Sequence, residues 1–169
     1  MDETSPQTTA NTQRLWSFRK QEITKNTSKF RANTFCFYSL NGRSVVDFHK
    51  NSKKEDIMDF LSLIRKRNPN GRIVVVIDNF KPLHFTETLM KVLELNISIV
   101  FFPYSPDLKI ELILKILNRI SKTFVASELH LKHIVQALFY RFSSTPSFAK
   151  SWINKFLGEE FIKCNKLCT

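Results

Sequence analysis

The chain has 169 residues, 43% of them hydrophobic, which is typical of one globular domain with a packed core and excludes a disordered protein. Lys and Arg exceed Asp and Glu by 26 − 15 = 11, and this surplus favours a polyanionic partner, nucleic acid first and an anionic membrane face second. The chain has only three glycines and no Gly-rich phosphate-binding motif, which argues against a nucleotide-binding loop.

No segment has the pattern of a membrane anchor or an export signal. No apolar run reaches the ~20 residues that span a bilayer, and the N-terminus lacks the apolar core of a signal peptide. Three cysteines, an odd number, favour a reducing compartment. We therefore expect an intracellular protein that is not inserted in a membrane.

The first 50 residues are predicted to be mainly strands and turns. Residues 14–18 form a short strand-like burst, and residues 30–40 form an aromatic strand. Asn41 and Gly42 predict a tight turn, because both tolerate positive φ, and residues 43–49 form the returning strand. This part of the chain therefore predicts an antiparallel hairpin.

A helix follows the hairpin. Ser52 is expected to cap it, with Glu55 in capping-box register, and residues 68–71 (Asn-Pro-Asn-Gly) end it. Its apolar residues recur at helical spacing, and they are Ile57, Phe60, Leu61 and Ile64.

Residues 72–79 are a nearly unbroken run of β-branched residues that predicts a strand buried on both faces. A helix over residues 86–95 and a second apolar strand over residues 97–102 follow. Three further helices are expected over residues 108–122, 127–142 and 146–157, before a tail at 158–169. This order predicts an α/β fold, a mixed sheet with helices packed on its faces.

Three acids form a candidate metal site: Asp2, Asp78 and Glu111. Asp78 ends a strand, at the edge where open α/β sheets place their ligands, and parallel strands would bring Glu111 towards the same edge. Carboxylates are the ligands that Mg²⁺ prefers, and two such ions activate an attacking oxygen and stabilise a leaving one at a phosphodiester. From spacing alone a second interpretation stands, in which Asp78 is a turn cap and Glu111 complements a helix dipole.

Short motifs around these acids resemble those of the catalytic domain of the mariner-type DDE transposases of insertion sequences, within the RNase H-like superfamily. The resemblance covers residues 2–157. The matching words are Asp2-Glu3, Val76-Ile77-Asp78-Asn79, and Pro103-Tyr104-Ser105-Pro106-Asp107-Leu108 followed shortly by Glu111.

The resemblance implies an RNase H-like mixed sheet, a β-hairpin plus βαβαβα, with helices on both faces, extra C-terminal helices and the first central strand largely missing. It implies one catalytic domain over residues 1–157, N-terminally truncated, followed by the tail. Asp2, Asp78 and Glu111 would be its catalytic residues and hold two Mg²⁺ (or Mn²⁺) ions. The activity would be metal-dependent cleavage and strand transfer on DNA phosphodiesters.

The partners implied are double-stranded DNA, as transposon ends and target, and further copies of the chain in a homo-oligomer when the protein is intact. No membrane partner and no small-molecule substrate are expected. A protein of this kind is expected in the prokaryotic cytoplasm, associated with the nucleoid.

The sequence also departs from the family pattern. Only Met1 precedes Asp2, where family members have a strand and a helix-turn-helix region. Between Asp78 and Glu111 lie 111 − 78 − 1 = 32 residues, two fewer than in the family. One residue lost near a helix start would rotate Glu111 by about 100°. These departures predict a truncated copy with impaired activity.

Two other functions remain open. One is a catalytically inactive remnant that binds nucleic acid or assembles with an intact transposase. The other is a ribonuclease H acting on RNA–DNA hybrids, which would share the acids but not the motif that begins at Pro103. Metal-dependent cleavage and the choice of substrate separate the three.

Other polar residues have simpler interpretations. Glu3 is expected to be a neighbour of the site and not a ligand, and His130 and His133 are expected on an exposed helix face. Two basic clusters, residues 53–54 and 65–67, flank one helix and either contact phosphates or are solvated helix ends.

Overall fold

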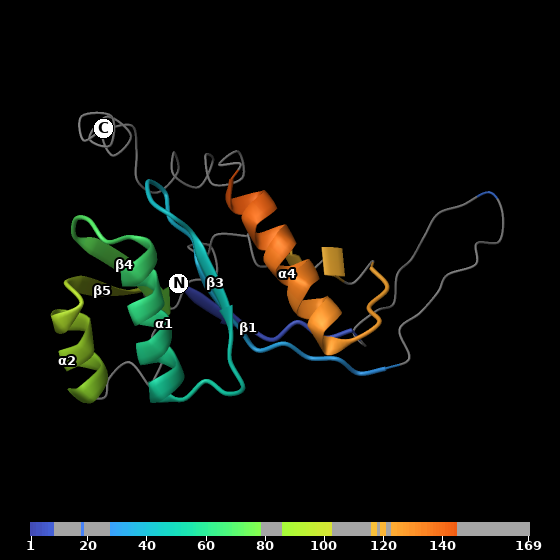
Figure 1. Cartoon of the computed structure of the whole chain (residues 1–169), viewed down its shortest axis with the longest axis horizontal. Helices are drawn as coiled ribbons and strands as arrows, with labels where there is room; N and C mark the ends of the chain where they lie inside the picture. The colour runs from blue at the N-terminus through green and yellow to red at the C-terminus, as the bar shows by residue number, and fades with distance from the viewer. Residues whose placement is uncertain are drawn as a thin grey trace.

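The structure is a computed structural model, and the residues it describes are 1–8, 18, 28–78, 86–102, 116–117, 119–120 and 123–144. Figure 1 shows how their helices and strands are arranged. The strands are β1 (Asp2–Thr4), β2 (Thr34–Phe37), β3 (Val45–Phe48), β4 (Ile73–Asp78) and β5 (Ile97–Phe102). The helices are α1 (Lys54–Arg67), α2 (Thr86–Glu94) and α4 (Glu128–Ser143).

The strands form two ladders that meet at the N-terminus. β1, β2 and β3 pair in that order and antiparallel, with Asp2 opposite Cys36, whereas β4 and β5 pair in parallel. The Met1 α-amino group donates to the Val76 carbonyl at 2.6 Å, which joins the start of β1 to β4. The mixed α/β architecture predicted from the sequence is therefore confirmed.

One hydrophobic core lies between the sheet and helices α1 and α2. All four apolar residues predicted to line one face of α1 have no exposed surface, namely Ile57, Phe60, Leu61 and Ile64. They belong to one cluster with Phe35 of β2, Val75 of β4 and Val92 of α2. Burying each such side chain stabilises the fold by about 1.5–3 kcal/mol, so the period of α1 determines which face docks.

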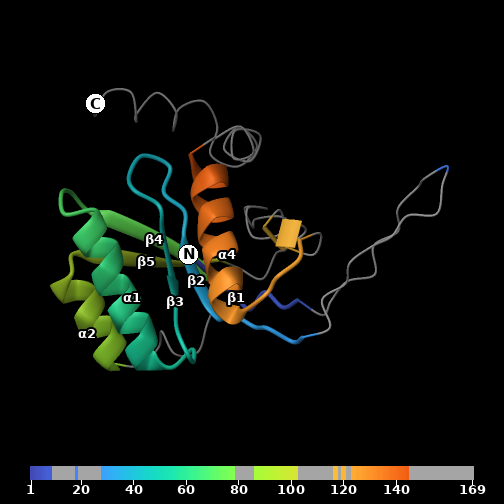
Figure 2. The same ribbon diagram turned by 45° about the vertical axis from the view of Figure 1, so that its right-hand side comes forward.

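A second core lies on the other face of the hairpin. Leu131, Val135 and Phe139 of α4 are fully buried, and they cluster with Cys36 of β2 and Val46 of β3. In both ribbon views α1 and α4 lie on opposite sides of the β2–β3 hairpin (Figures 1 and 2). The hairpin is thus the middle layer, as the expected helices on both faces require.

The prediction that the β4 strand is buried on both faces is wrong. Ile73, Val75 and Ile77 are buried, but Val74 between them is 52% exposed, and Val100 of β5 is 48% exposed. Among the described helices, α1 and α2 cover one face of β4 and β5, while α4 packs on the hairpin instead. The strand is therefore half-buried, although its composition is apolar throughout.

The antiparallel hairpin is confirmed, but its turn differs from the expected one. The β2–β3 ladder closes with Phe37 opposite Val45, so the connection is residues 38–44 and not a two-residue turn. Neither Asn41 nor Gly42 has positive φ. The turn type inferred from these two residues is therefore wrong.

Gly42 serves a close approach instead of a special backbone angle. A Cβ at this position would lie 2.6 Å from Asn68 Oδ1 and 2.9 Å from Ser39 Oγ. Asn68 holds the neighbouring residue at both main-chain groups, because Arg43 N donates to Asn68 Oδ1 at 2.7 Å and Asn68 Nδ2 donates to Arg43 O at 3.0 Å. The C-terminal end of α1 is thereby bound to the hairpin loop.

The start of α1 lies one residue later than expected. Lys53 is the N-cap, and its main-chain N donates to the Asp56 carboxylate at 3.1 Å. The predicted capping box of Ser52 and Glu55 is therefore wrong. The Ser52 hydroxyl instead donates to the carboxylate of Glu3, from β1. A tertiary contact has replaced the local cap.

The remaining elements are confirmed where the structure describes them. α2 and β5 occupy the expected residues, and α4 begins after Ser127, whose hydroxyl accepts from His130 N at 3.1 Å. The helix expected over residues 108–122 is described at 116–117 and 119–120, which are helical. The residues outside the description include 14–17, 146–157 and 158–169. No described helix combines the length and apolar character needed to cross a bilayer.

Candidate active site

Asp2 lies where the two ladders meet. It pairs with Cys36 of β2, and the residue before it, Met1, donates to Val76 of β4. The Asp2 side chain is partly buried, and its Oδ1 accepts from Glu3 N at 2.9 Å, which restrains the carboxylate. Asp2 is therefore a partly accessible acid on the strand that lies next to β4 at the junction of the two ladders.

Asp78 approaches the same place along β4. It is the last residue of that strand, opposite Phe102 of β5. From the hydrogen bond between Met1 and Val76, Asp2 is one residue further along its chain and Asp78 two residues further along β4. Asp2 and Asp78 therefore each lie within two residues of the hydrogen bond that joins β1 to β4.

Glu111 lies outside the described residues, and of Asp78 the main chain is described but not the side chain. Within the described part of the chain, no group of three or more His, Cys, Asp or Glu side chains is arranged to hold a metal ion. The three-acid site remains a prediction, in which the chemistry of the donors, carboxylates at a sheet edge, fits a hard divalent cation.

The charge of Asp2 acts on its neighbour in the ladder. Burial raises the pKa of the Cys36 thiol well above its usual range, the negative charge of Asp2 raises this pKa further, and the positive N-terminus lowers it. A thiol in this setting stays protonated at neutral pH, so Cys36 is a core residue and not a nucleophile or a metal ligand.

Glu3 belongs to a polar network on the other side of β1. Its carboxylate accepts from the Ser52 hydroxyl, which in turn accepts from Asn33 Nδ2 at 2.9 Å. Asn33 Oδ1 accepts from the Ser5 hydroxyl at 2.9 Å. This network ties β1 to the loop before α1 and so fixes the strand that carries Asp2.

A cluster of titratable side chains that the sequence pattern did not reveal surrounds His49. Its Nδ1 lies 3.2 Å from Asp56 Oδ1, and its Nε2 lies 3.3 Å from Asp47 Oδ2, the latter without hydrogen-bond geometry. The ring contacts Phe35 and Phe60 edge-on. The cluster joins β3 to α1 and so has a structural role. In its sheet, β3 is the strand furthest from β1, which adjoins β4.

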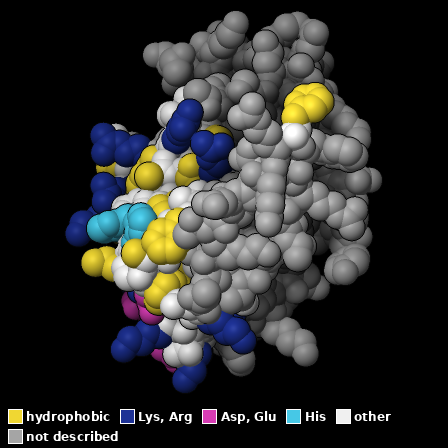
Figure 3. Space-filling model, turned by 90° about the vertical axis from the view of Figure 1, so that its right-hand side faces the viewer, with side chains coloured by type: hydrophobic (Ala, Val, Ile, Leu, Met, Phe, Trp, Pro, Cys, Tyr) yellow, Lys and Arg dark blue, Asp and Glu magenta, His cyan; other side chains and the backbone are white. Residues whose placement is uncertain are grey.

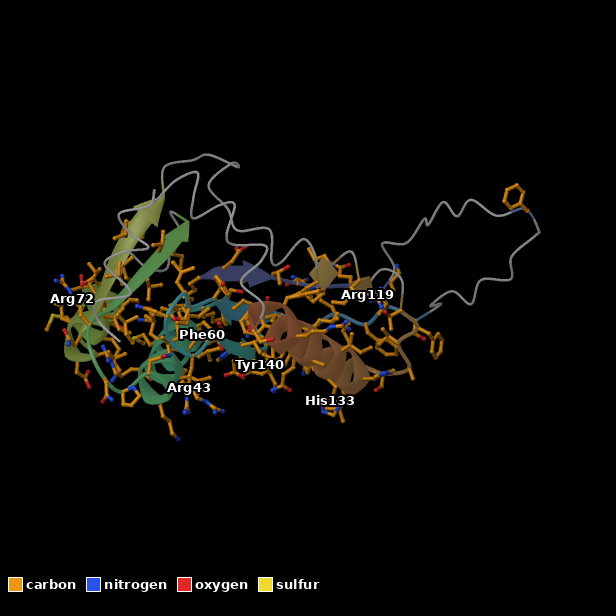
Figure 4. The ribbon with its side chains drawn as sticks, turned by 90° about the horizontal axis from the view of Figure 1, so that it is seen from above. Arg43, Phe60, Arg72, Arg119, His133 and Tyr140 are labelled. Atoms are coloured by element: carbon orange, nitrogen blue, oxygen red, sulfur yellow. The ribbon has the colours of Figure 1, made fainter. Side chains whose placement is uncertain are left out.

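The two histidines of α4, His130 and His133, lie on its exposed face. His130 is exposed, and its Nδ1 accepts from Ala126 N at 3.2 Å as part of the helix cap. His133 is exposed, and in Figure 4 its side chain points away from α4 at the lower margin of the described side chains. The expectation of an exposed helix face is confirmed.

Both the sequence and the fold have relatives among known proteins. A family model described as "DDE superfamily endonuclease" matches residues 1–131. A search of the curated proteins finds no match.

Among solved structures, the fold is similar to three complexes of one transposase. The Mos1 transposase paired-end complex with left transposon end has a TM-score of 0.70 at 16% identity, covering 98% of this chain and 53% of the other. The Mos1 Strand Transfer Complex has a TM-score of 0.68 at 15% identity, with 97% and 52% covered. The Mos1 mariner paired end complex with Mn has a TM-score of 0.67 at 16% identity, with 98% and 53% covered.

At these identities the structures establish a shared fold, and the chain spans about half the length of the transposase it matches. The family model covers more than three quarters of the chain, and its range includes Asp2, Asp78 and Glu111. The protein therefore belongs to the DDE superfamily endonucleases.

Proposed function

We propose that this chain is a transposase catalytic domain that cuts and joins DNA at transposon ends, with Asp2, Asp78 and Glu111 as its catalytic acids. The observation that carries the proposal is the family match over residues 1–131, which spans all three acids. The hydrogen bond between Met1 and Val76 supports it, because it brings the strand of Asp2 beside the strand that ends at Asp78.

In this mechanism the three carboxylates would hold two Mg²⁺ or Mn²⁺ ions. These ions would supply activation of the attacking oxygen and neutralise charge on the phosphodiester. The chain itself orients the carboxylates: Glu3 N holds one oxygen of Asp2, and the β4–β5 ladder holds the main chain of Asp78. The surplus of 11 basic charges attracts the phosphate backbone. In Figure 3, Lys and Arg are commoner than acids over the described part of the face.

Plasmid cleavage tests the proposal. The substrate is a supercoiled plasmid that carries the genomic segments on both sides of the coding sequence, with Mg²⁺ or Mn²⁺ added. We expect nicking that EDTA stops and that Asp78→Ala lowers at least 100-fold, because a lost ligand removes the metal-dependent chemistry. The matched control is Asp59→Ala, an exposed acid of α1, which should cleave as the wild type does. Equal loss in both variants, or cleavage that survives Asp78→Ala, would disprove the assignment.

A second function is favoured by the interval of 32 residues between Asp78 and Glu111, two short of the family pattern. It is a remnant that binds DNA or associates with intact copies without cutting. Binding of the same plasmid in EDTA together with no cleavage in either metal would select it. In either case we place the protein with the nucleoid of a prokaryotic cell, as a homo-oligomer when the protein is intact.

A further inference from the structure

The end of the sheet opposite Asp78 carries a group of exposed basic side chains from three different elements. Arg43 lies in the hairpin loop, Lys66 and Arg67 lie in the last turn of α1, and Arg72 directly precedes β4. We call these four residues the basic end. Because β4 spans six residues, the basic end lies roughly 17 Å from Asp78 along the strand.

Two side chains hold the loops of the basic end in place. Asn68 bonds both main-chain groups of Arg43 and also donates to Ile64 O at 3.2 Å, so the hairpin loop is fixed to α1. Arg65 donates to Gly71 O at 2.9 Å, and its other nitrogens donate to Leu95 O at 2.6 Å and Asn96 O at 2.7 Å. The loop that carries Arg72 is thereby fixed to the turn after α2.

These contacts also divide the basic residues into two kinds. The guanidinium of Arg65 is occupied by main-chain carbonyls, so it is not a phosphate ligand. Arg43, Lys66 and Arg67 have no side-chain acceptor among the described residues, and Arg72 uses only its Nε, which donates to Ser98 Oγ at 3.0 Å. Figure 4 looks down on this part, where Arg43 and Arg72 lie at the periphery.

The helix dipole does not explain the whole group. Lys66 and Arg67 complement the C-terminus of α1, but Arg43 and Arg72 lie on other elements. These four like charges, two at the end of α1 and two on ordered loops, repel one another, and a bound polyanion would relieve this repulsion.

We propose that the basic end is a second DNA-backbone contact, separate from the acids and independent of metal. The choice of DNA as the polyanion rests on the proposed function. The four side chains contact phosphates and not bases, so they supply affinity without sequence preference.

The test measures DNA affinity of the full chain in EDTA, where no cleavage occurs. The probe is a 5′-fluorescent duplex of arbitrary sequence, about 30 base pairs long, followed by anisotropy at several salt concentrations. A variant with Arg43, Lys66, Arg67 and Arg72 all changed to Gln should bind at least about tenfold more weakly, and the slope of log K against log salt should shrink by about three to four.

The control variant loses the same charge elsewhere. Lys29, Lys50, Lys53 and Arg119 are exposed and lie outside the basic end, and changing all four to Gln should alter the salt slope by less than one. Equal losses in the two variants would show that only net charge matters and would overturn the proposal. So would tighter binding of duplex RNA with the same four-residue dependence, because the partner would then be RNA.

A third variant separates ordering from charge. Asn68→Ala keeps all four basic residues but releases Arg43, so the slope should fall by about one while circular dichroism shows a folded chain. An unchanged slope would contradict the role of Asn68. Failure of the cleavage assay alone disproves the proposed catalysis and leaves the binding result standing, so the two proposals fail separately.

Discussion

At the scale of single residues, neighbours in space determine chemistry more than residue type does. Cys36 has a raised thiol pKa because β2 buries it and because Asp2 lies opposite it in the ladder. Arg65 and Lys66 are adjacent in one basic cluster, yet carbonyl groups occupy the first and solvent surrounds the second. Neither difference is readable from composition.

The pKa of Cys36 has a consequence for stability. The ordinary thiol pKa is 9.0, and the folded value is raised, so above pH 9 the unfolded chain loses a proton that the folded chain keeps. The stabilisation is therefore fully present below pH 9 and declines above it, by up to about 1.4 kcal/mol per pH unit.

Urea unfolding at pH 8 to 10.5 measures this effect. Relative to Cys36→Ala, the wild type should lose stability more steeply above pH 9, and the difference between the two slopes isolates Cys36 from Lys and Tyr. Parallel curves for the two proteins would contradict a raised pKa.

At the scale of elements, the β2–β3 hairpin loop contacts the C-terminal end of α1 at Gly42, which leaves room for Asn68. Gly42 allows Asn68 to reach the main chain of Arg43, and a Cβ at Gly42 would lie within 3 Å of two side-chain oxygens. This contact explains why a glycine occurs in a loop with no positive φ at that position.

Gly42→Ala should therefore lower the free energy of unfolding by about 1–3 kcal/mol, because Asn68 must give up hydrogen bonds or the loop must shift. The measurement is a double-mutant cycle by urea unfolding. In an Asn68→Ala background the same change should cost less, since the nearer of the two oxygens it meets is gone and only Ser39 Oγ remains. An equal cost in both backgrounds would place the strain elsewhere.

At the scale of the whole molecule, two cores share the β2–β3 hairpin. Phe60 is fully buried in the core of α1, and Phe139 is fully buried in the core of α4. The β2–β3 hairpin contributes Phe35 to the first core and Cys36 to the second, since successive side chains point to opposite faces. Loss of either core therefore removes support from the same strands.

We expect Phe60→Ala and Phe139→Ala each to lower the free energy of unfolding by about 3–5 kcal/mol, within one cooperative transition. Far-ultraviolet circular dichroism and the hydrodynamic radius, followed through the same urea titration, should give coincident curves. Leu129→Ala, at a position 64% exposed on α4, should change the midpoint little. Separate transitions for the two Phe variants would show that the cores unfold independently.

The sequence by itself determined the order and type of the described elements from β2 to α4, the buried face of α1 and the family, because hydrophobic period and short motifs are local properties. It did not predict β1, whose three residues carry no such period. Asp78 at the end of β4 follows from the same local pattern. These features need no knowledge of which segments meet.

Only the tertiary structure decided how those elements use their neighbours. In the folded chain Val74 is exposed although its strand is apolar, and Ser52 contacts Glu3 instead of capping α1. Gly42 lies against Asn68. Each outcome depends on a segment distant in sequence, since burial and hydrogen bonding are properties of pairs of surfaces. The placement of Asp2 beside the strand of Asp78 is of this kind, because one hydrogen bond across 75 positions produces it.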